Sequence, residues 1–134
     1  MRMWMVDPQL LCDQHLAGEH VETHMFVGAI RKGTSLRGYV AKGLVETQRL
    51  RERHDALAAE MQRRGMRHES ALPEFSVDPQ GSVDPAASLS ELARRCVRCR
   101  TRQSETRQAP TFGDAISELG FNRAAELLKP SRRA

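Results

Sequence analysis

Two aspartate–proline pairs constrain the fold of this chain more than any other feature. In Asp7-Pro8 and in Asp84-Pro85, an aspartate suited to the N-cap precedes a proline suited to the first helical turn. Arg31-Lys32-Gly33 and Arg64-Gly65 place basic residues just before a glycine, which is typical of a helix end. No stretch shows the sustained apolar–polar alternation of a strand. We therefore predict an all-α fold, a compact single-domain bundle of three main helices plus short C-terminal helices.

Apolar periodicity fills the segments between these signals. The predicted helices run from Asp7-Pro8 to Arg31, from about Leu44 to Arg64 and from Pro85 onward, followed by short ones at 115–119 and 122–129. Segments 33–43 and 66–83 hold glycine or proline and are predicted to be irregular. The predicted core stripes are Leu50, His54, Leu57 and Met61 on the second helix, and Leu89, Leu92, Cys96 and Cys99 on the third.

The positive charge is concentrated in two blocks. The chain holds 21 Lys+Arg and 17 Asp+Glu, and almost all the basic residues lie in 31–68 and 94–134, on either side of an acidic stretch. This pattern favours a phosphate-binding surface for nucleic acid, the alternative being solvated helix faces with internal ion pairs. No apolar run is long enough to span a bilayer, and the N-terminus does not resemble a signal peptide. We expect a cytoplasmic, nucleoid-associated protein without a membrane partner.

The first helix carries a chemically unusual stripe. His15, Glu19 and Glu22 fall in line at helical spacing. Two carboxylates this close can serve acid–base chemistry, or can pair with arginines of the 31–68 block. His20 and His24, four residues apart, have a spacing that can chelate a metal, but no third ligand is evident. We therefore expect no metal there.

Two further motifs keep a functional and a structural interpretation. Cys96-Val-Arg-Cys99 supplies two of the four ligands of a structural zinc site, and Cys12 with a histidine could complete the set. Because Cys96 and Cys99 lie on the apolar stripe, packing as small hydrophobes is the favoured interpretation. Residues 115–128 fit either a helix-turn-helix, with Asn122 and Arg123 starting the recognition helix, or a packed helical hairpin.

Several segments together resemble one family. Asp13-Gln14-His15-Leu16, then Glu19, Glu22, Gly28-Ala29 and Arg31-Lys32, resemble the phage endonuclease V family of pyrimidine-dimer DNA glycosylases. The runs GEHVETH at 18–24 and RHDALAAEMQRRGMRHESAL at 53–72 are similar to its cellular branch. The resemblance covers about residues 1–75, a helical core with an N-terminal active site. Residues 76–134, with the third helix, short helices and a basic tail, complete the expected single domain 1–134.

The resemblance implies a compact all-α glycosylase that excises a damaged pyrimidine and cuts the resulting abasic site. The implied nucleophile is the N-terminal α-amine, which attacks the anomeric carbon and forms a Schiff base; α-amines are partly neutral near neutral pH. Met1 would supply the amine, because Arg2 is too large for removal of the initiator methionine. Glu22 falls on the catalytic glutamate of the family. The implied contacts to double-stranded, lesion-containing DNA are Arg2, Gln14, His15, His20, Arg31 and Lys32.

The resemblance further implies a monomer that needs no metal and no organic cofactor. One departure concerns Val21 and Met25, which are apolar where the phage pattern has basic residues. This change predicts a different lesion, a modified base, or weaker kinking of the duplex. Two alternative functions remain: a non-catalytic basic DNA-binding module, and a small zinc-stabilised interaction protein built on Cys96 and Cys99.

Overall fold

The all-α prediction is confirmed. The computed structural model describes residues 1–68 and 70–108, which contain helices and no strand. The helices are α1 (Asp13–Arg31), α2 (Arg37–Ala41), α3 (Leu50–Arg63), α4 (Pro85–Arg95) and α5 (Val97–Gln108), with 3-10 turns at Pro8–Leu10 and Thr47–Arg49. None of these helices combines the length and apolar character that crossing a membrane requires.

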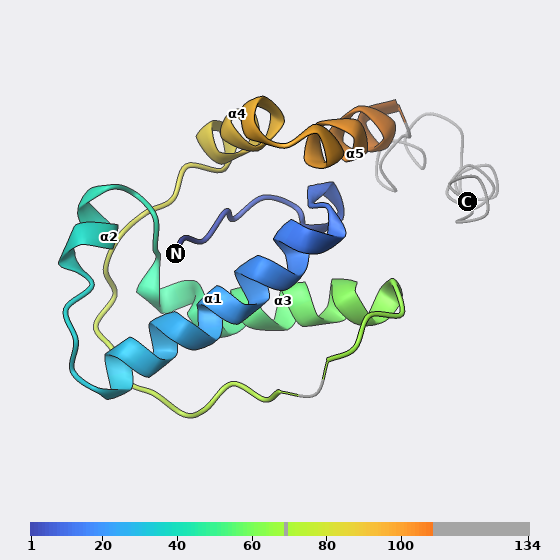
Figure 1. The fold of residues 1–134 in the computed structure, drawn as a ribbon. Coiled ribbons are helices and arrows are strands. Elements are labelled where there is room, and N and C mark those ends of the chain that lie inside the picture. The colour runs from blue at the N-terminus through green and yellow to red at the C-terminus, as the bar shows by residue number, and fades with distance from the viewer. Residues whose placement is uncertain (69, 109–134) are drawn as a thin grey trace, which may run out of the picture.

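The pair formed by α1 and α3 carries the core, and α4 and α5 lie beyond the N-terminal segment (Figure 1). The predicted stripe on α3 is confirmed, because all four of its side chains are buried. Met3 and Trp4 are neighbours in sequence but belong to two different apolar clusters. One cluster contains Trp4, Leu11, Leu16, Leu57 and Leu92, and the other Met3, Phe26, Val45, Leu50 and Val83.

The N-terminal segment is therefore built into the molecule. Its backbone N–H at Met3 donates to the Leu44 carbonyl at 2.7 Å, and the side chains of Met3 and Trp4 are buried. Met5 adopts a φ of 58°, which a residue with a side chain rarely takes. The first residues are thus held in one path beside α1, and the chain's amino end comes to lie next to that helix.

The first helix begins later than the sequence predicted. Asp7 caps only the short turn Pro8–Leu10, and Leu11 and Cys12 then adopt extended backbone. Leu11 is fully buried, so this break turns its side chain into the core. Cys12 is the true N-cap of α1, and its sulfur accepts the N–H of His15.

The third helix is divided in two. Cys96 has φ −133° and ψ 112°, so α4 ends there and α5 starts at Val97. The second predicted helix also starts later, at Leu50 after a 3-10 turn, and α2 forms inside the predicted loop 33–43. The short helices expected at 115–119 and 122–129, with Asn122 and Arg123, lie outside the described residues.

The described residues of the connection 66–83, all but residue 69, form no helix or strand, as predicted, and part of the connection hydrogen-bonds with the segment before α3. Thr47 binds it through its N–H to the Gln80 carbonyl at 2.9 Å, and Glu46 accepts the Val83 N–H at 2.7 Å. Gly81 has a φ of 86°, and a Cβ there would lie 2.1 Å from the Val45 carbonyl oxygen. Only glycine fits this close approach, which sets the path of the chain toward α4.

Candidate active site at the N-terminus

Glu22 lies beside the amino end of the chain. Its Oε1 is 3.9 Å from the Met1 nitrogen and accepts the backbone N–H of Arg2 at 2.6 Å. The exposed fraction is 27% for the Glu22 side chain and 17% for that of Met1. An amine and a carboxylate therefore meet in a partly buried position that solvent and a ligand can still reach.

Glu19, one turn earlier on α1, has a different environment. Both of its oxygens accept from Arg53, at 2.6 and 2.9 Å, and Oε2 also accepts the Trp4 N–H at 3.1 Å. Arg53 donates in addition to the Val6 carbonyl at 2.6 Å. Glu19 thus pairs with an arginine of the 31–68 block, the structural alternative in the sequence analysis, while Glu22 faces the amine.

Arg2 extends from the same backbone toward α4. Its guanidinium carbon lies 3.7 Å from the centre of the Trp4 ring, and Nη2 donates to Ser88 Oγ at 3.1 Å. Burial lowers the pKa of Arg2, and the charge of Arg95 lowers it further against the opposing effect of nearby carboxylates. Arginine still stays charged at neutral pH. Arg2 therefore brings a fixed cation one residue from the amine.

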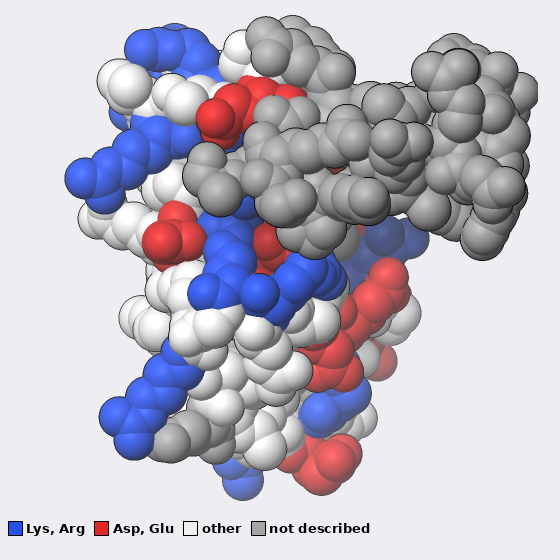
Figure 2. Space-filling view, turned by 90° about the vertical axis from the view of Figure 1, so that its right-hand side faces the viewer, with Lys and Arg blue, Asp and Glu red and all other residues white. Residues whose placement is uncertain are grey.

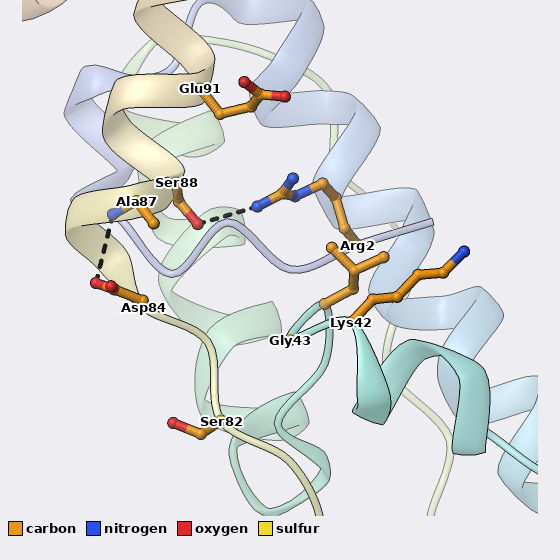
Figure 3. Close-up of a pocket in the computed structure, with 9 residues that line it drawn as sticks. Arg2, Lys42, Gly43, Ser82, Asp84, Ala87, Ser88 and Glu91 are labelled. Atoms are coloured by element: carbon orange, nitrogen blue, oxygen red, sulfur yellow. Dashed lines mark hydrogen bonds between the residues drawn. The ribbon is translucent and has the colours of Figure 1, made fainter.

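A pocket of about 370 Å³ opens around that cation (Figure 3). Arg2 and Lys42 contribute positive charge, and Asp84 and Glu91 contribute negative charge at the start and middle of α4. The volume falls at the lower end of what small-ligand sites enclose. Lys42 and Ser88 carry no motif, so sequence reasoning missed them.

The remaining predicted DNA contacts do not all reach the surface. Gln14, Arg31 and Lys32 are exposed, the last two at the C-terminal end of α1. His20 is buried, and its Nε2 lies 3.2 Å from Nε2 of His54. Because residues two apart point to nearly opposite sides of a helix, His20 lies away from Glu22. We leave His20 out of the candidate interface.

His15 also faces inward, toward cysteines. Its Nδ1 is 3.3 Å from Cys12 Sγ, and its ring meets the Trp4 ring edge-on. Burial lowers the pKa of His15, and the charge of Arg95 acts in the same direction. The imidazole is therefore neutral at neutral pH.

Many arginines of the two basic blocks are held in ion pairs. Arg64 pairs with Asp13 and Glu60, Arg63 with Glu60, and Arg94 with Glu91. Figure 2 shows one face, on which basic and acidic side chains alternate over the described residues. The exposed cations between the last turn of α1 and the end of α2 form a group that we name the basic edge: Arg31, Lys32, Arg37 and Lys42.

Two groups of side chains in the described part of the chain are arranged so that they could hold a metal ion. One contains His20, His54 and His68, and the other Cys12, His15, Cys96 and Cys99. His24, which stands at a chelating spacing from His20 in the sequence, is not a member of the first group, and its ring packs edge-on against that of His20. The sequence had offered Cys12 and an unspecified histidine as partners of Cys96 and Cys99, and the structure identifies this histidine as His15. The group of His20, His54 and His68 was not evident from the sequence, because its members come from distant segments.

The fold and the site define a small helical protein whose amino end and a glutamate meet beside a cation-lined pocket. An amine next to a carboxylate is an arrangement suited to covalent catalysis through nitrogen. Residues 1–74 match the model of the pyrimidine dimer DNA glycosylase family, and the chain belongs to this family. No curated protein and no solved structure matches the chain.

Proposed function

We propose that this protein is a DNA-repair glycosylase that excises a damaged pyrimidine, a pyrimidine dimer or a related lesion, and cleaves the abasic site. The observation that carries the proposal is the position of the Met1 nitrogen, 3.9 Å from Glu22 Oε1. Membership of the pyrimidine dimer DNA glycosylase family supports DNA as the substrate.

In the proposed reaction, the neutral amine attacks C1′ of the damaged nucleotide. The new N–C1′ bond forms as the glycosidic bond breaks, and the base leaves with the bonding electrons. Glu22 accepts the proton that the amine loses and returns it to O4′ as the C1′–O4′ bond breaks, which opens the sugar ring and leaves a protonated imine between the amine and C1′. The carboxylate then stabilises the positive charge of this imine and takes up a C2′ proton, and the C3′–O bond to the 3′ phosphate breaks. Water finally hydrolyses the imine and releases the enzyme.

The N–H of Arg2 has a positioning role in this scheme. It holds Oε1 of Glu22 at 2.6 Å, so the carboxylate is oriented before substrate binds. Such preorganisation is one of the main ways in which enzymes stabilise charge in a transition state.

The DNA is proposed to approach across the basic edge and the pocket. Arg2 and Lys42 line the pocket, and Arg31 and Lys32 carry exposed positive charge at the C-terminal end of α1. These cations suit phosphate contacts, which position a duplex without reading its sequence. Extruding a nucleotide costs a few kcal/mol and is cheapest at a damaged site. We propose that the protein acts as a monomer on double-stranded DNA.

The test is borohydride trapping on an abasic-site duplex. The native chain, verified by intact mass to start at Met1, is compared with one that carries an added Gly-Ser at its N-terminus. A covalent adduct is expected only with the native chain, because the extension moves the amine away from Glu22. An equal adduct with both proteins would assign the nucleophile to a lysine and overturn the proposal.

Glu22→Gln tests the carboxylate. It keeps the size and the hydrogen bond from Arg2 but removes the proton acceptor, so cleavage of ultraviolet-irradiated DNA should fall by roughly 10²–10⁴-fold. Glu52→Gln, at an exposed position on α3, is the matched control and should leave cleavage unchanged. Unchanged cleavage in Glu22→Gln, or binding to DNA without any cleavage by the native protein, would favour the non-catalytic DNA-binding alternative.

A further inference from the structure

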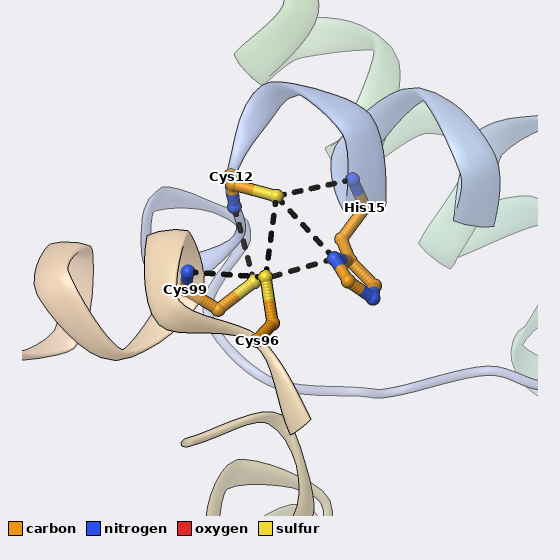
Figure 4. Close-up of side chains that lie close together, drawn as sticks. All are labelled: Cys12, His15, Cys96 and Cys99. Atoms are coloured by element: carbon orange, nitrogen blue, oxygen red, sulfur yellow. Dashed lines mark hydrogen bonds between the residues drawn. The ribbon is translucent and has the colours of Figure 1, made fainter. Parts of the chain in front are cut away.

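Four potential metal ligands from two ends of the described chain converge at the start of α1 (Figure 4). Cys12 caps α1 and His15 lies in its first turn. Cys96 occupies the break between α4 and α5, and Cys99 lies in the first turn of α5. The four ligand atoms all lie within 4.8 Å of one another.

The distances match the edges of a small tetrahedron. Cys12 Sγ is 3.9 Å from Cys96 Sγ, and His15 Nδ1 is 3.3 Å from Cys12 Sγ and 3.5 Å from Cys99 Sγ. With Zn–S bonds of about 2.3 Å and Zn–N bonds of about 2.0–2.1 Å, sulfur atoms stand about 3.8 Å apart and sulfur and nitrogen about 3.6 Å. The side chains therefore need only small shifts to surround an ion.

Each sulfur also accepts a backbone N–H. His15 N donates to Cys12 Sγ, Cys99 N to Cys96 Sγ, and Cys12 N to Cys99 Sγ, each at 3.4 Å. Hydrogen bonds of this kind, made outside the ligand set, orient ligand atoms toward a metal ion. Thiolate is the form of cysteine that binds zinc.

Packing alone is a weaker explanation. Cys12 and Cys99 do belong to the apolar cluster with Leu11, Leu16 and Leu92. Small hydrophobes do not require an imidazole nitrogen among three sulfurs, nor a helix that breaks so that the sulfur of Cys96 joins them.

We infer that Cys12, His15, Cys96 and Cys99 bind one zinc ion in a closed, structural site. Four protein ligands complete the tetrahedral coordination, so no position is left for a substrate or a catalytic water. Three thiolates and neutral imidazole give the loaded site a net charge of −1, and loading releases the thiol protons. This inference takes up the zinc alternative that the sequence analysis ranked below packing, it departs from the implication of the resemblance that no metal is needed, and it does not depend on the proposed reaction.

The ion would tie α5 to the N-terminal half of the molecule. Cys12 and Cys96 are 84 residues apart, and the two later ligands lie outside the region matched by the family. The site also lies close to the amino end, since the His15 ring contacts the Trp4 ring and the guanidinium of Arg2 packs over that Trp4 ring. A zinc ion here would hold both the C-terminal helices and the Trp4 side of the active site.

The test is the zinc content of the full chain, purified with reductant, incubated with zinc chloride and desalted. One zinc per chain is expected by elemental analysis. Cys96→Ser is the informative variant, because Cys96 is only half-buried. It should lose the ion, whereas His68→Asn, in the histidine group, should retain it. A wild-type protein that holds no zinc, or retention in Cys96→Ser with loss in His68→Asn, would overturn the inference.

Cobalt(II) substitution tests the same site without any variant. Three sulfur ligands should give strong thiolate-to-cobalt charge-transfer absorption and the intense visible bands of a tetrahedral ion. A cobalt spectrum without sulfur charge transfer, or a Cys96–Cys99 disulfide in protein trapped with a thiol reagent at lysis, would contradict the inference.

Discussion

At the scale of single residues, two glutamates one turn apart on α1 have different environments and different partners. Glu19 is fully enclosed and shared between Arg53 and the Trp4 N–H, whereas Glu22 is partly exposed and contacts the amine and the Arg2 N–H. The first holds the N-terminal segment in place, and the second is available for chemistry. The backbone N–H of Arg2 donates to Glu22 and that of Trp4 donates to Glu19, so the same N-terminal segment contacts both carboxylates.

The pair of Glu19 and Arg53 is a test of that structural role. Arg53→Met leaves an uncompensated carboxylate in the core and should lower the free energy of unfolding by roughly 3–5 kcal/mol in denaturant titrations. The double variant Arg53→Met/Glu19→Gln should be less destabilised than the sum of the two single variants, because the unpaired charge is gone. Additive effects would contradict the tight coupling seen in the structure.

At the scale of elements, α1 presents an exposed apolar pair around the candidate catalytic residue. Val21 is 54% and Met25 51% exposed, on either side of Glu22. These are the two positions where the sequence analysis noted apolar residues in place of the basic residues of the phage pattern. We therefore expect this face of α1 to contact the DNA through apolar side chains, which can wedge between bases but cannot neutralise phosphates.

Val21→Lys/Met25→Lys is the corresponding prediction. Each added charge that reaches a phosphate releases about one counterion, so the plot of log K against log salt for abasic DNA should steepen by about 2. Unfolding free energy should change by less than about 0.5 kcal/mol, since both sites are exposed. Gln62→Lys, exposed in the last turn of α3, is the control. An unchanged slope would show that this face of α1 does not meet the DNA.

At the scale of the whole molecule, a histidine cluster joins α1, α3 and the connection after α3. Four imidazole rings pack edge-on or tilted against one another, those of His20, His24, His54 and His68. Asp55 Oδ1 lies 2.9 Å from His54 Nδ1. Burial, with repulsion from the neighbouring rings, lowers the pKa of His20 to about 4. Burial also lowers the pKa of His24, against a hydrogen bond with the backbone of Ser70. The folded state therefore favours the neutral forms of His20 and His24.

The sign of the pH dependence follows. In the unfolded chain His20 binds a proton below a pKa of about 6.5, whereas in the folded chain it binds this proton only below a pKa of about 4. Stability should be full above pH 6.5 and fall toward pH 4, with His20 alone contributing a loss of about 2 kcal/mol at pH 5. His20→Gln, which still hydrogen-bonds but does not titrate, should show a shallower loss between pH 7 and 5 in urea titrations. Equal slopes would contradict the burial of a neutral His20.

Some features of the fold and the site follow from the sequence. Asp84-Pro85, Gly65 and the stripe of Leu50, Leu57 and Met61 act locally, through capping and helical periodicity, so they predicted helix ends and the buried face of α3 correctly. The stripe of α1 likewise drew attention to Glu22. The breaks at Leu11–Cys12 and at Cys96 were not predicted, because tertiary contacts override continuous periodicity there.

What the sequence by itself determined is therefore the helical class, the C-terminal ends of α1 and α3, the start of α4, the family and the residue types offered for chemistry. Only the tertiary structure decided which of them meet: Glu19 with Arg53, Glu22 with the amino end, His20 with His54 and His68, and Cys12 and His15 with Cys96 and Cys99. The physical reason is range. Capping and periodicity operate within a few residues, whereas these contacts join segments up to 87 residues apart and depend on how those segments pack together.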